Sequence, residues 1–301
     1  MKGSLFNQIE TFLTIAQEGS IRGAARKLEL SPPAVSNALK QLESYLGLPL
    51  FTRTTRTIEF TEAGKCLMEQ TSPAMNALHQ ALESVQDLSQ IPSGKVRITV
   101  PRFAYQLIVE PIYAEFCSLY PEVELEISVS NTSINIIKEG YDAGIRFGHR
   151  IEEGMVARPL MPKMKEALFA TPDYLERFGS PSTPQDLQHH KLIQYRYMPS
   201  NQLAPLELND KGETIRLDPP LSMIVNDTDL MIDAASKGLG IGRIVGPMIQ
   251  EGLSSGQFIP ILEEYWIEYP GLYIYFPQHS QKARRVRVLV DFICQKSTTL
   301  L

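Results

Sequence analysis

The chain has 301 residues, of which 43% are hydrophobic and 21% charged, so it can form two or three domains and is too apolar to be intrinsically disordered. The net charge of −5 is unevenly distributed, because the first sixty residues carry seven basic and five acidic side chains and the remainder a net −7. A basic head on an acidic body indicates nucleic acid binding at one end and another role elsewhere.

Targeting signals, membrane spans and metal sites are not expected. The first ten residues contain no long apolar run, and no segment reaches the roughly 20 apolar residues of a membrane helix. Cys66, Cys117 and Cys294 lack metal-type spacing, and free thiols are favoured over a redox role. We therefore expect a cytoplasmic protein that needs no cofactor and no metal.

The first sixty residues have the pattern of three short helices followed by a β-hairpin. Apolar residues recur at helical spacing over residues 4–18, Ser20 can cap a second helix, and Ser31 can cap a third that ends at Gly47. Residues 50–60 contain two short β-prone pieces. This order predicts a winged helix-turn-helix.

The third helix and the hairpin carry the candidate DNA-binding side chains. Val35, Leu39 and Leu42 share one apolar face of the helix, so the opposite face is available to DNA. Asparagine can bond bidentately to adenine, and lysine or arginine reaches phosphate or guanine. The candidates are Ser31, Pro32, Pro33, Ser36, Asn37 and Lys40 on the helix, and Arg53 and Arg56 beside the wing tip. Each residue alone fits a solvated surface equally well, but together they favour DNA binding.

Residues 61–90 are predicted to form one long helix. An apolar seam with alternating steps of four and three, typical of a two-stranded coiled coil, runs through Leu67, Thr71, Ala74, Leu78, Ala81, Val85 and Leu88. We expect this helix to mediate dimerisation, and packing on its own domain is the alternative. Pro73 lies inside the helix and is expected to bend it.

After the linker at residues 91–94, strands alternate with helices, which predicts an α/β domain. The expected strands are 96–100, 123–129, 143–147, 167–170 and 241–245, and the expected helices are 104–119 with a break at Pro111, 134–138, 172–179, one from 184, and 227–238. Sheets of this type bind ligands beyond the C-terminal ends of their strands.

Many residues at the turns and apolar faces of the N-terminal segment form a dense, ordered set. They are Phe12, Ala16, Gly19-Ser20, Ala24-Ala25, Leu28, Ser31 to Ser36, Leu39 to Glu43, Leu46-Gly47, Leu50-Phe51, Arg53 and Thr61 to Gly64. This set resembles the LysR-type transcriptional regulators over about sixty residues. Family members commonly carry Gln where Pro32 and Asn37 stand, so base preference is expected to differ.

C-terminal segments extend the resemblance to a LysR subgroup. They are Glu139 to Asp142, Ile145 to Gly148, Val156 to Leu160, Pro172 to Leu175, Gly238 to Ile241 and Arg287 to Phe292, while Asn135 stands where Asp is common. The resemblance implies an α+β multidomain protein. Its parts are a winged helix-turn-helix DNA-binding domain (1–60), a linker or dimerisation helix (61–90) and a two-lobed, periplasmic-binding-protein-like α/β effector-binding domain (91–301). Lobe one is expected at about 91–163 and 269–301, and lobe two at about 164–268.

The same likeness places an effector between the lobes. The candidate effector-binding residues are Pro101, Arg102, Phe103, Ser130, Asn131, Arg146 and Phe147 on lobe one, and Thr171, Asn226, Asp227 and the backbone near Gly240 on lobe two. Free N–H groups at helix N-termini and a bidentate grip by arginine both suit a carboxylate, so we expect an anionic effector. A structural Arg146 paired with Asp142 is an equally favoured alternative.

The sequence therefore predicts a transcriptional regulator that binds promoter or operator DNA and a small molecule, and the resemblance implies a homodimer or homotetramer. One alternative is a metabolite-binding or enzymatic domain fused to a DNA-binding head, although no catalytic motif is present. Another is an architectural DNA-binding protein whose pocket has no ligand. The Gly238-x-Gly240-x-Gly242 motif is interpreted as a helix C-cap, and His189-His190 as a loop pair.

Overall fold

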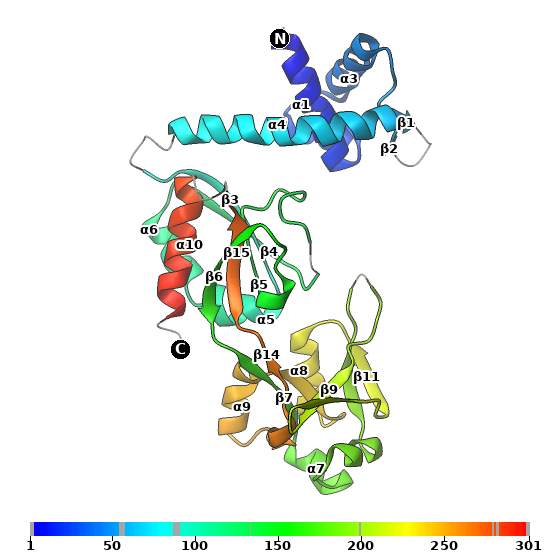
Figure 1. Cartoon of the computed structure of the whole chain (residues 1–301), viewed down its shortest axis with the longest axis vertical. Coiled ribbons are helices and arrows are strands. Elements are labelled where there is room, and N and C mark those ends of the chain that lie inside the picture. The colour runs from blue at the N-terminus through cyan, green and yellow to red at the C-terminus, as the bar shows by residue number, and fades with distance from the viewer. Residues whose placement is uncertain are drawn as a thin grey trace. The chain divides into compact units, whose positions relative to one another are not determined.

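The computed structural model describes residues 3–53, 58–86, 91–132, 134–198, 200–278, 280 and 283–298 (Figure 1). The chain divides into two compact units, Met1–Leu88 and Ser89–Leu301. Within the described ranges, no helix is both long and apolar enough to span a membrane.

The first unit is a winged helix-turn-helix, as predicted. Its elements are α1 (Gly3–Glu18), α2 (Ile21–Lys27), α3 (Pro32–Leu46), β1 (Phe51–Arg53), β2 (Ile58–Phe60) and α4 (Glu62–Gln86). The Ser20 and Ser31 hydroxyls accept the capping hydrogen bonds of α2 and α3 from Gly23 N and Ala34 N. Gly47 ends α3 with a φ of 72°, in the left-handed region.

The core of this unit is built around three aromatic rings. Phe12 of α1 lies 5.3 Å from Phe51 of β1, and Phe51 lies 5.2 Å from Phe60 of β2, measured between ring centroids. The rings join the antiparallel β1–β2 hairpin to the helices, and Val35 and Leu39 of α3 pack into the same core. Burial of the apolar face of α3 fixes which of its faces remains exposed.

Helix α4 continues through Pro73 and packs on its own unit along part of its length. Leu67 and Met68 contact the core and Met75 is buried in it, whereas the Leu78 side chain is 42% exposed. Packing on its own domain therefore accounts for one side of α4. The Ala81 and Val85 side chains and Leu88 lie outside the described residues, and dimerisation through this helix stays a prediction.

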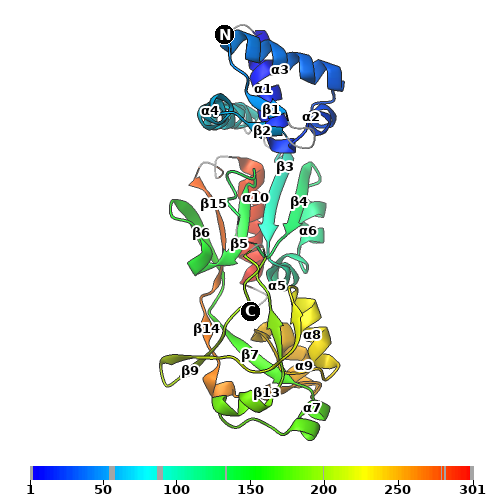
Figure 2. The same cartoon turned by 90° about the vertical axis from the view of Figure 1, so that its right-hand side faces the viewer.

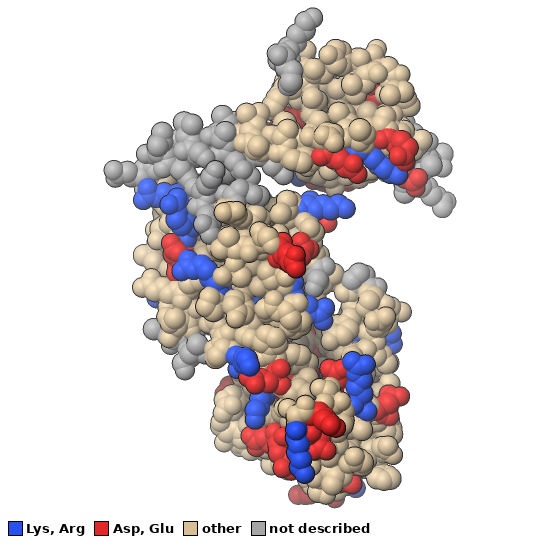
Figure 3. Space-filling view, viewed as in Figure 1, with Lys and Arg blue, Asp and Glu red and all other residues tan. Residues whose placement is uncertain are grey.

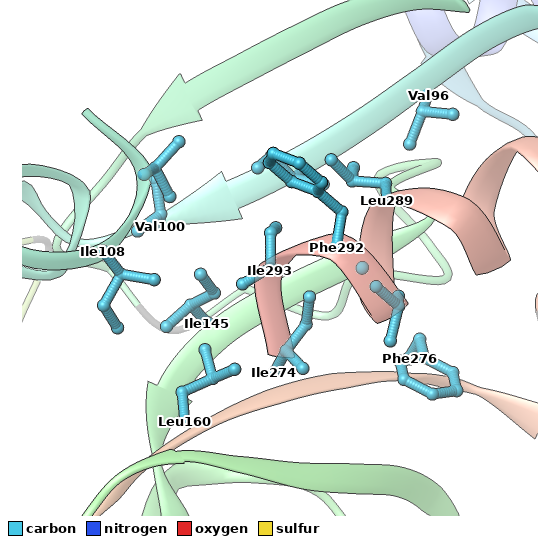
Figure 4. Close-up of a cluster of buried hydrophobic side chains, with 14 of the residues drawn as sticks. Val96, Val100, Ile108, Ile145, Leu160, Ile274, Phe276, Leu289, Phe292 and Ile293 are labelled. Atoms are coloured by element: carbon cyan, nitrogen blue, oxygen red, sulfur yellow. The ribbon is translucent and has the colours of Figure 1, made fainter. Parts of the chain in front are cut away.

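Lobe one of the second unit is a five-stranded mixed sheet in the order β4-β3-β5-β15-β6. Its elements are β3 (Gly94–Val100), α5 (Arg102–Ala104), η1 (Tyr105–Val109), α6 (Tyr113–Leu119), β4 (Val123–Val129), β5 (Ala143–Phe147), η2 (Gly148–Arg150), β6 (Met155–Met161), β15 (Leu272–Pro277) and α10 (Arg284–Ser297). Apolar side chains of α10, including Leu289 and Ile293, pack against the strands (Figure 4).

Two predicted helices of lobe one differ from the structure. The expected helix at 104–119 has the predicted break at Pro111, where proline cannot donate the helical hydrogen bond, but its first part consists of α5 and the π-helical η1 and only its second part, α6, is an ordinary α-helix. Residues 136–140 form turns where a short helix was expected at 134–138. Asn135 Oδ1 accepts a hydrogen bond from Lys138 N and so favours a turn.

Lobe two is built around β7, which pairs antiparallel with β12, β13 and β14. Its elements are β7 (Met164–Ala170), α7 (Pro172–Phe178), η3 (Pro184–His189), β8 (Leu192–Tyr195), β9 (Leu206–Asp210), β10 (Glu213–Leu217), β11 (Leu221–Val225), α8 (Thr228–Ser236), β12 (Gly242–Val245), η4 (Gly246–Ile249), α9 (Gln250–Ser254), β13 (Ile259–Ile261), η5 (Glu263–Tyr265) and β14 (Glu268–Tyr269). Helix α8 packs against β7, β8, β11 and β12. Figure 2 shows α8 in yellow beside β7. Strands β6, β8 to β11 and β13 to β15 were not predicted.

The chain passes between the lobes twice. Strand β6 belongs to the sheet of lobe one and β7 to that of lobe two, with residues 162–163 between them. On the return, β14 pairs with β7, and β15 re-enters the sheet of lobe one after residues 270–271. These adjacent crossings are where the lobes can bend relative to one another.

Candidate functional site

The face of α3 opposite the core presents the candidate DNA-binding side chains to solvent. Pro32, Pro33, Asn37 and Lys40 are exposed and Ser36 is half-buried. The helix therefore offers a hydrogen-bonding amide and an ammonium group on one accessible face, which matches what base edges and phosphates require.

Three other candidates have different positions. The Ser31 hydroxyl already accepts from Ala34 N as the cap of α3. Arg53 is the last residue of β1, but its side chain lies outside the described residues, as does all of Arg56. Contact of these arginines with DNA stays a prediction.

A cavity of about 560 Å³ lies between the lobes of the second unit. Among the predicted residues, its lining includes Pro101, Phe103, Asn131, Arg146 and Phe147. Pro101 and Phe103 follow the end of β3, and Asn131 follows the end of β4. Arg146 and Phe147 are the last two residues of β5. These five candidates thus lie on the wall of one cavity, and their contact with an effector stays a prediction.

Arg146 is a buried arginine that holds the strand ends of lobe one together. Its guanidinium donates to the carbonyl oxygens of Thr99, Ile145, Ser130 and Thr132 and to the Thr99 hydroxyl, at 2.7–3.3 Å. Burial lowers the pKa of Arg146 from its ordinary value. Most of the acceptors of Arg146 are therefore backbone carbonyls. Asp142, the partner expected in the structural alternative, instead accepts a hydrogen bond from Arg97 N through its carboxylate.

The positive charge of Arg146 has no acidic counterpart nearby. Among the described residues, no carboxylate lies within ion-pair distance of its guanidinium, and Nε has no hydrogen-bond partner although the side chain is buried. A buried cation surrounded only by dipoles favours a nearby anion.

Lobe two contributes a second buried arginine that the sequence did not indicate. Arg243 of β12 donates to the carbonyl oxygens of Pro205 and Ala204 at 2.6 Å and to Gln194 Oε1 at 3.0 Å. Its Nη1 lies 3.6 Å from Glu166 Oε2, an ion pair too long for a hydrogen bond. Arg243 Nε also has no partner.

Burial controls the protonation of the groups around Arg243. Loss of hydration raises the pKa of Glu166, and nearby Arg243 opposes this shift. Burial also raises the pKa of Tyr269 well above its ordinary range, and the nearby Glu166 adds to this shift. Burial and the nearby Arg150 lower the pKa of His149. Each shift favours the neutral form of its group, so arginine dominates the charge of the cavity.

Six predicted effector positions do not line the cavity, namely Arg102, Ser130, Thr171, Asn226, Asp227 and the backbone at Gly240. Thr171 is the buried cap of α7, and Asp227 caps α8 by accepting from Asp229 N and Leu230 N. The Ser130 and Asn226 carbonyls accept from Arg146 and Tyr195, respectively. These caps satisfy N–H groups that were expected to bind the effector. The Gly240 backbone approaches Lys191, since an added Cβ would lie 2.5 Å from the Lys191 oxygen.

Polar side chains at the rim of the cavity connect the two lobes. Gln106 Nε2 donates to Asp229 Oδ1, and Asn131 Nδ2 donates to the Tyr195 hydroxyl, each at 2.9 Å. Arg102 Nε lies 3.8 Å from Asp229 Oδ2, at the edge of ion-pair distance. We refer to Arg102, Gln106 and Asp229 as the rim clasp. Arg102 therefore lies at the lobe boundary and not on the cavity wall.

Both parts of the chain match known families. Residues 6–65 match the family described as bacterial regulatory helix-turn-helix protein, lysR family, and residues 89–297 match the LysR substrate binding domain. The chain belongs to the LysR family. It is a DNA-binding transcriptional regulator with an effector-binding domain.

Relatives and solved structures cover nearly the whole chain. The uncharacterized HTH-type transcriptional regulator YcaN of Escherichia coli (strain K12) is 31% identical over 94% of this chain and 92% of its own. PgrR, an HTH-type transcriptional regulator of the same strain, is 28% identical over 97% of each chain. The full-length Vibrio cholerae virulence activator AphB has a TM-score of 0.66 at 24% identity, covering 98% of this chain and 99% of its own. LysG from Corynebacterium glutamicum has a TM-score of 0.61 at 22% identity, covering 96% and 98%.

In this LysR-family regulator, the cavity residues that sequence reasoning missed come mostly from lobe two and the crossing strands. They include Thr132, His149, Arg150, Glu166, Tyr195, Tyr197, Met198, Gln202, Arg243 and Tyr269. Most follow no capping or glycine signal, because their positions depend on how β7, β12 and β14 pair. Figure 3 shows acidic and basic side chains intermixed over one face of lobe two, in contrast to the excess of arginine in the cavity.

Proposed function

We propose that this regulator binds a small anionic effector in the cavity between the lobes. The observation that carries the proposal is the buried, unpaired charge of Arg146 on the cavity wall. Arg150 and Arg243 add to it, and Glu166 is the one carboxylate among the described lining residues. LysG, which shares the fold, is described with the effector Arg bound, and this supports a small molecule in a domain of this type.

A regulatory and not a catalytic role is proposed for the cavity. The related YcaN and PgrR are both named as transcriptional regulators, and they match nearly the full length of this chain. Incubating the purified protein with a bound acid and measuring product formation tests the point. Turnover would favour the alternative of an enzymatic domain attached to a DNA-binding head.

The proposed mechanism is a shift between lobe arrangements. An effector that binds the closed arrangement more tightly increases its population, and in a homotetramer built from two dimers this alters the spacing of the DNA-binding heads and the bend of the promoter. The crossings at residues 162–163 and 270–271 supply the point of bending, and the rim clasp stabilises the closed arrangement.

Removing the rim clasp is expected to weaken effector binding. Asp229→Ala deletes the acceptor of Gln106 Nε2 and the partner of Arg102. These groups are partly exposed, so the loss is about 0.5–1 kcal/mol and the effector affinity should fall about two- to fivefold. Titration of the full chain by calorimetry measures this change.

Lys237→Ala is the matched control for the clasp, because Lys237 directly follows α8 and pairs with Asp233 of the same helix. We expect its effector affinity to equal that of the wild type. Equal affinities for both variants would show that the clasp does not contribute to closure.

The exposed face of α3 is expected to have two separable roles in DNA binding. Lys40→Ala should weaken binding to most sequences and reduce the dependence of log K on log salt by about one. Asn37→Ala should relax preference at one base position, at a cost of roughly 1–3 kcal/mol. Lys138→Ala, an exposed lysine of the effector-binding domain, serves as the charge control. Wild-type binding by both α3 variants would place recognition elsewhere.

Footprinting upstream of the regulator's own gene, with and without a pool of organic acids, tests the proposed function. Protected half-sites a whole number of helical turns apart are expected from a symmetric oligomer. Altered protection with an acid supports the anionic effector. Unaltered protection with every acid would contradict it and favour an architectural protein.

A further inference from the structure

The cavity between the lobes is unusually rich in aromatic side chains. Five of its twenty described lining residues are Phe or Tyr, whereas these residues and Trp make up 8% of the whole chain. They are Phe103, Phe147, Tyr195, Tyr197 and Tyr269, and His149 adds a sixth ring. A general binder of small anions does not require such a wall.

Four of these rings form a nearly parallel group centred on Phe147. The ring of Phe103 lies 5.3 Å from that of Phe147 at 23°, and the ring of Tyr269 lies 5.3 Å from it at 26°. His149 lies 5.9 Å from Phe147 at 16°. The rings come from α5, β5, η2 and β14, so this common orientation arises only in the folded domain.

A flat ring is the ligand shape that such a wall favours. Aromatic rings attract one another in offset-stacked arrangements with centroids about 4.5–7 Å apart, and a further ring can extend the group at that spacing. A puckered aliphatic ring of the same size has no π-face and cannot approach as closely over its whole area. The wall therefore discriminates by planarity.

The charges of the cavity specify the other part of the ligand. Arg146 and Arg243 line opposite lobes, each is only 5% exposed, and the Nε of each lacks a partner. Both guanidinium groups are held in place by backbone carbonyls. A carboxylate attached to a flat ring would place its charge near these cations while its ring meets the aromatic wall.

We infer that the effector is an aromatic carboxylate, with its ring against Phe103, Phe147 and Tyr269 and its acid group toward the buried arginines. This inference rests on the proposed anionic effector and names its chemical class. The cavity volume of about 560 Å³ admits one ring with a side chain or two fused rings.

Matched pairs of acids test the inference on the full chain. Benzoate is compared with cyclohexanecarboxylate, and phenylacetate with cyclohexylacetate, since each pair has the same charge and carbon number but differs in planarity. Calorimetry is expected to show the aromatic member binding about tenfold more tightly. In Phe147→Leu this preference should fall to about twofold or less, whereas Tyr113→Leu, an exposed aromatic on α6, should retain it.

The outcomes separate this inference from the proposed function. Equal binding within each pair, together with an altered footprint, would overturn the aromatic class and leave the anionic effector standing. A saturated acid that binds more tightly than its aromatic counterpart has the same consequence. Absence of binding by all four acids, together with a footprint that responds to another, non-aromatic acid, also overturns the aromatic class. If no acid of any kind alters the footprint, both proposals fail.

Discussion

Replacing Gly64 by alanine is expected to destabilise the winged helix-turn-helix by about 3 kcal/mol and to abolish specific DNA binding. An alanine Cβ at this position would lie 2.0 Å from the carbonyl oxygen of Leu50. Intrinsic helix propensity alone predicts the opposite sign, since alanine is favoured over glycine by about 1 kcal/mol inside a helix. The steric clash determines the outcome because the neighbouring atom belongs to the backbone.

The Leu50 carbonyl cannot move away cheaply. It accepts hydrogen bonds from Thr61 N and the Thr61 hydroxyl, and Leu50 N donates to Glu43 Oε1 at 2.8 Å. Thr61 also caps α4, because its hydroxyl accepts from Gly64 N. A shift of Leu50 would therefore disturb the junction of α3, the wing and α4 together.

Hydrogen–deuterium exchange of the full chain measures this effect, since peptides of the first sixty residues report that domain separately. Gly246→Ala is the matched control, because its Cβ would meet the nearest backbone oxygen at 3.7 Å, an ordinary contact. We expect the control to change stability by less than about 1 kcal/mol. The prediction is contradicted if Gly64→Ala lowers the exchange protection of its own domain no more than Gly246→Ala lowers that of the effector-binding domain.

Replacing Arg146 by methionine is expected to destabilise the effector-binding domain by about 3 kcal/mol and to abolish the response to acids. Methionine fills a similar volume but leaves the carbonyls of Ser130 and Thr132 without their Arg146 donor. The end of β3 at Thr99 and the segment after β4 then lose the group that joins them to β5. The same substitution removes a buried positive charge from the cavity wall.

Arg150→Met separates the two effects, because Arg150 lines the same cavity but is exposed. It removes one positive charge at little expected cost in stability. Urea unfolding followed by the fluorescence of Trp266, the single tryptophan of the chain, measures both variants. Equal unfolding midpoints would show that Arg146 does not hold the strand ends together.

Local sequence signals were sufficient for the DNA-binding head. The capping serines Ser20 and Ser31, the glycine at the end of α3 and the apolar face containing Val35 and Leu39 all act within one or two turns of chain. Their spacing therefore predicted both the helices and the exposed face. The tight contact at Gly64 could be noticed as part of a motif, but its cause, the approach of Leu50, is visible only after folding.

The lining of the cavity between the lobes was predictable only in part. Strand ends of lobe one follow directly from the chain pattern, so Phe103, Arg146 and Phe147 could be named in advance. Capping residues such as Thr171 and Asp227 carry the same local signal as a ligand site, and the folded chain uses them for its own helices. Sequence alone does not distinguish these two uses of a helix N-terminus.

The sequence by itself determined the family, the winged helix-turn-helix and the strands β3, β4 and β5 of lobe one, because these depend on short-range periodicity, caps and turns. Only the tertiary structure decided which charges and rings surround the cavity. Glu166, Arg243 and Tyr269 come from three strands of lobe two, and strand pairing brings them to the wall that Phe147 shares from lobe one. Such long-range pairing leaves no local signal, since the strands that pair are far apart in the sequence.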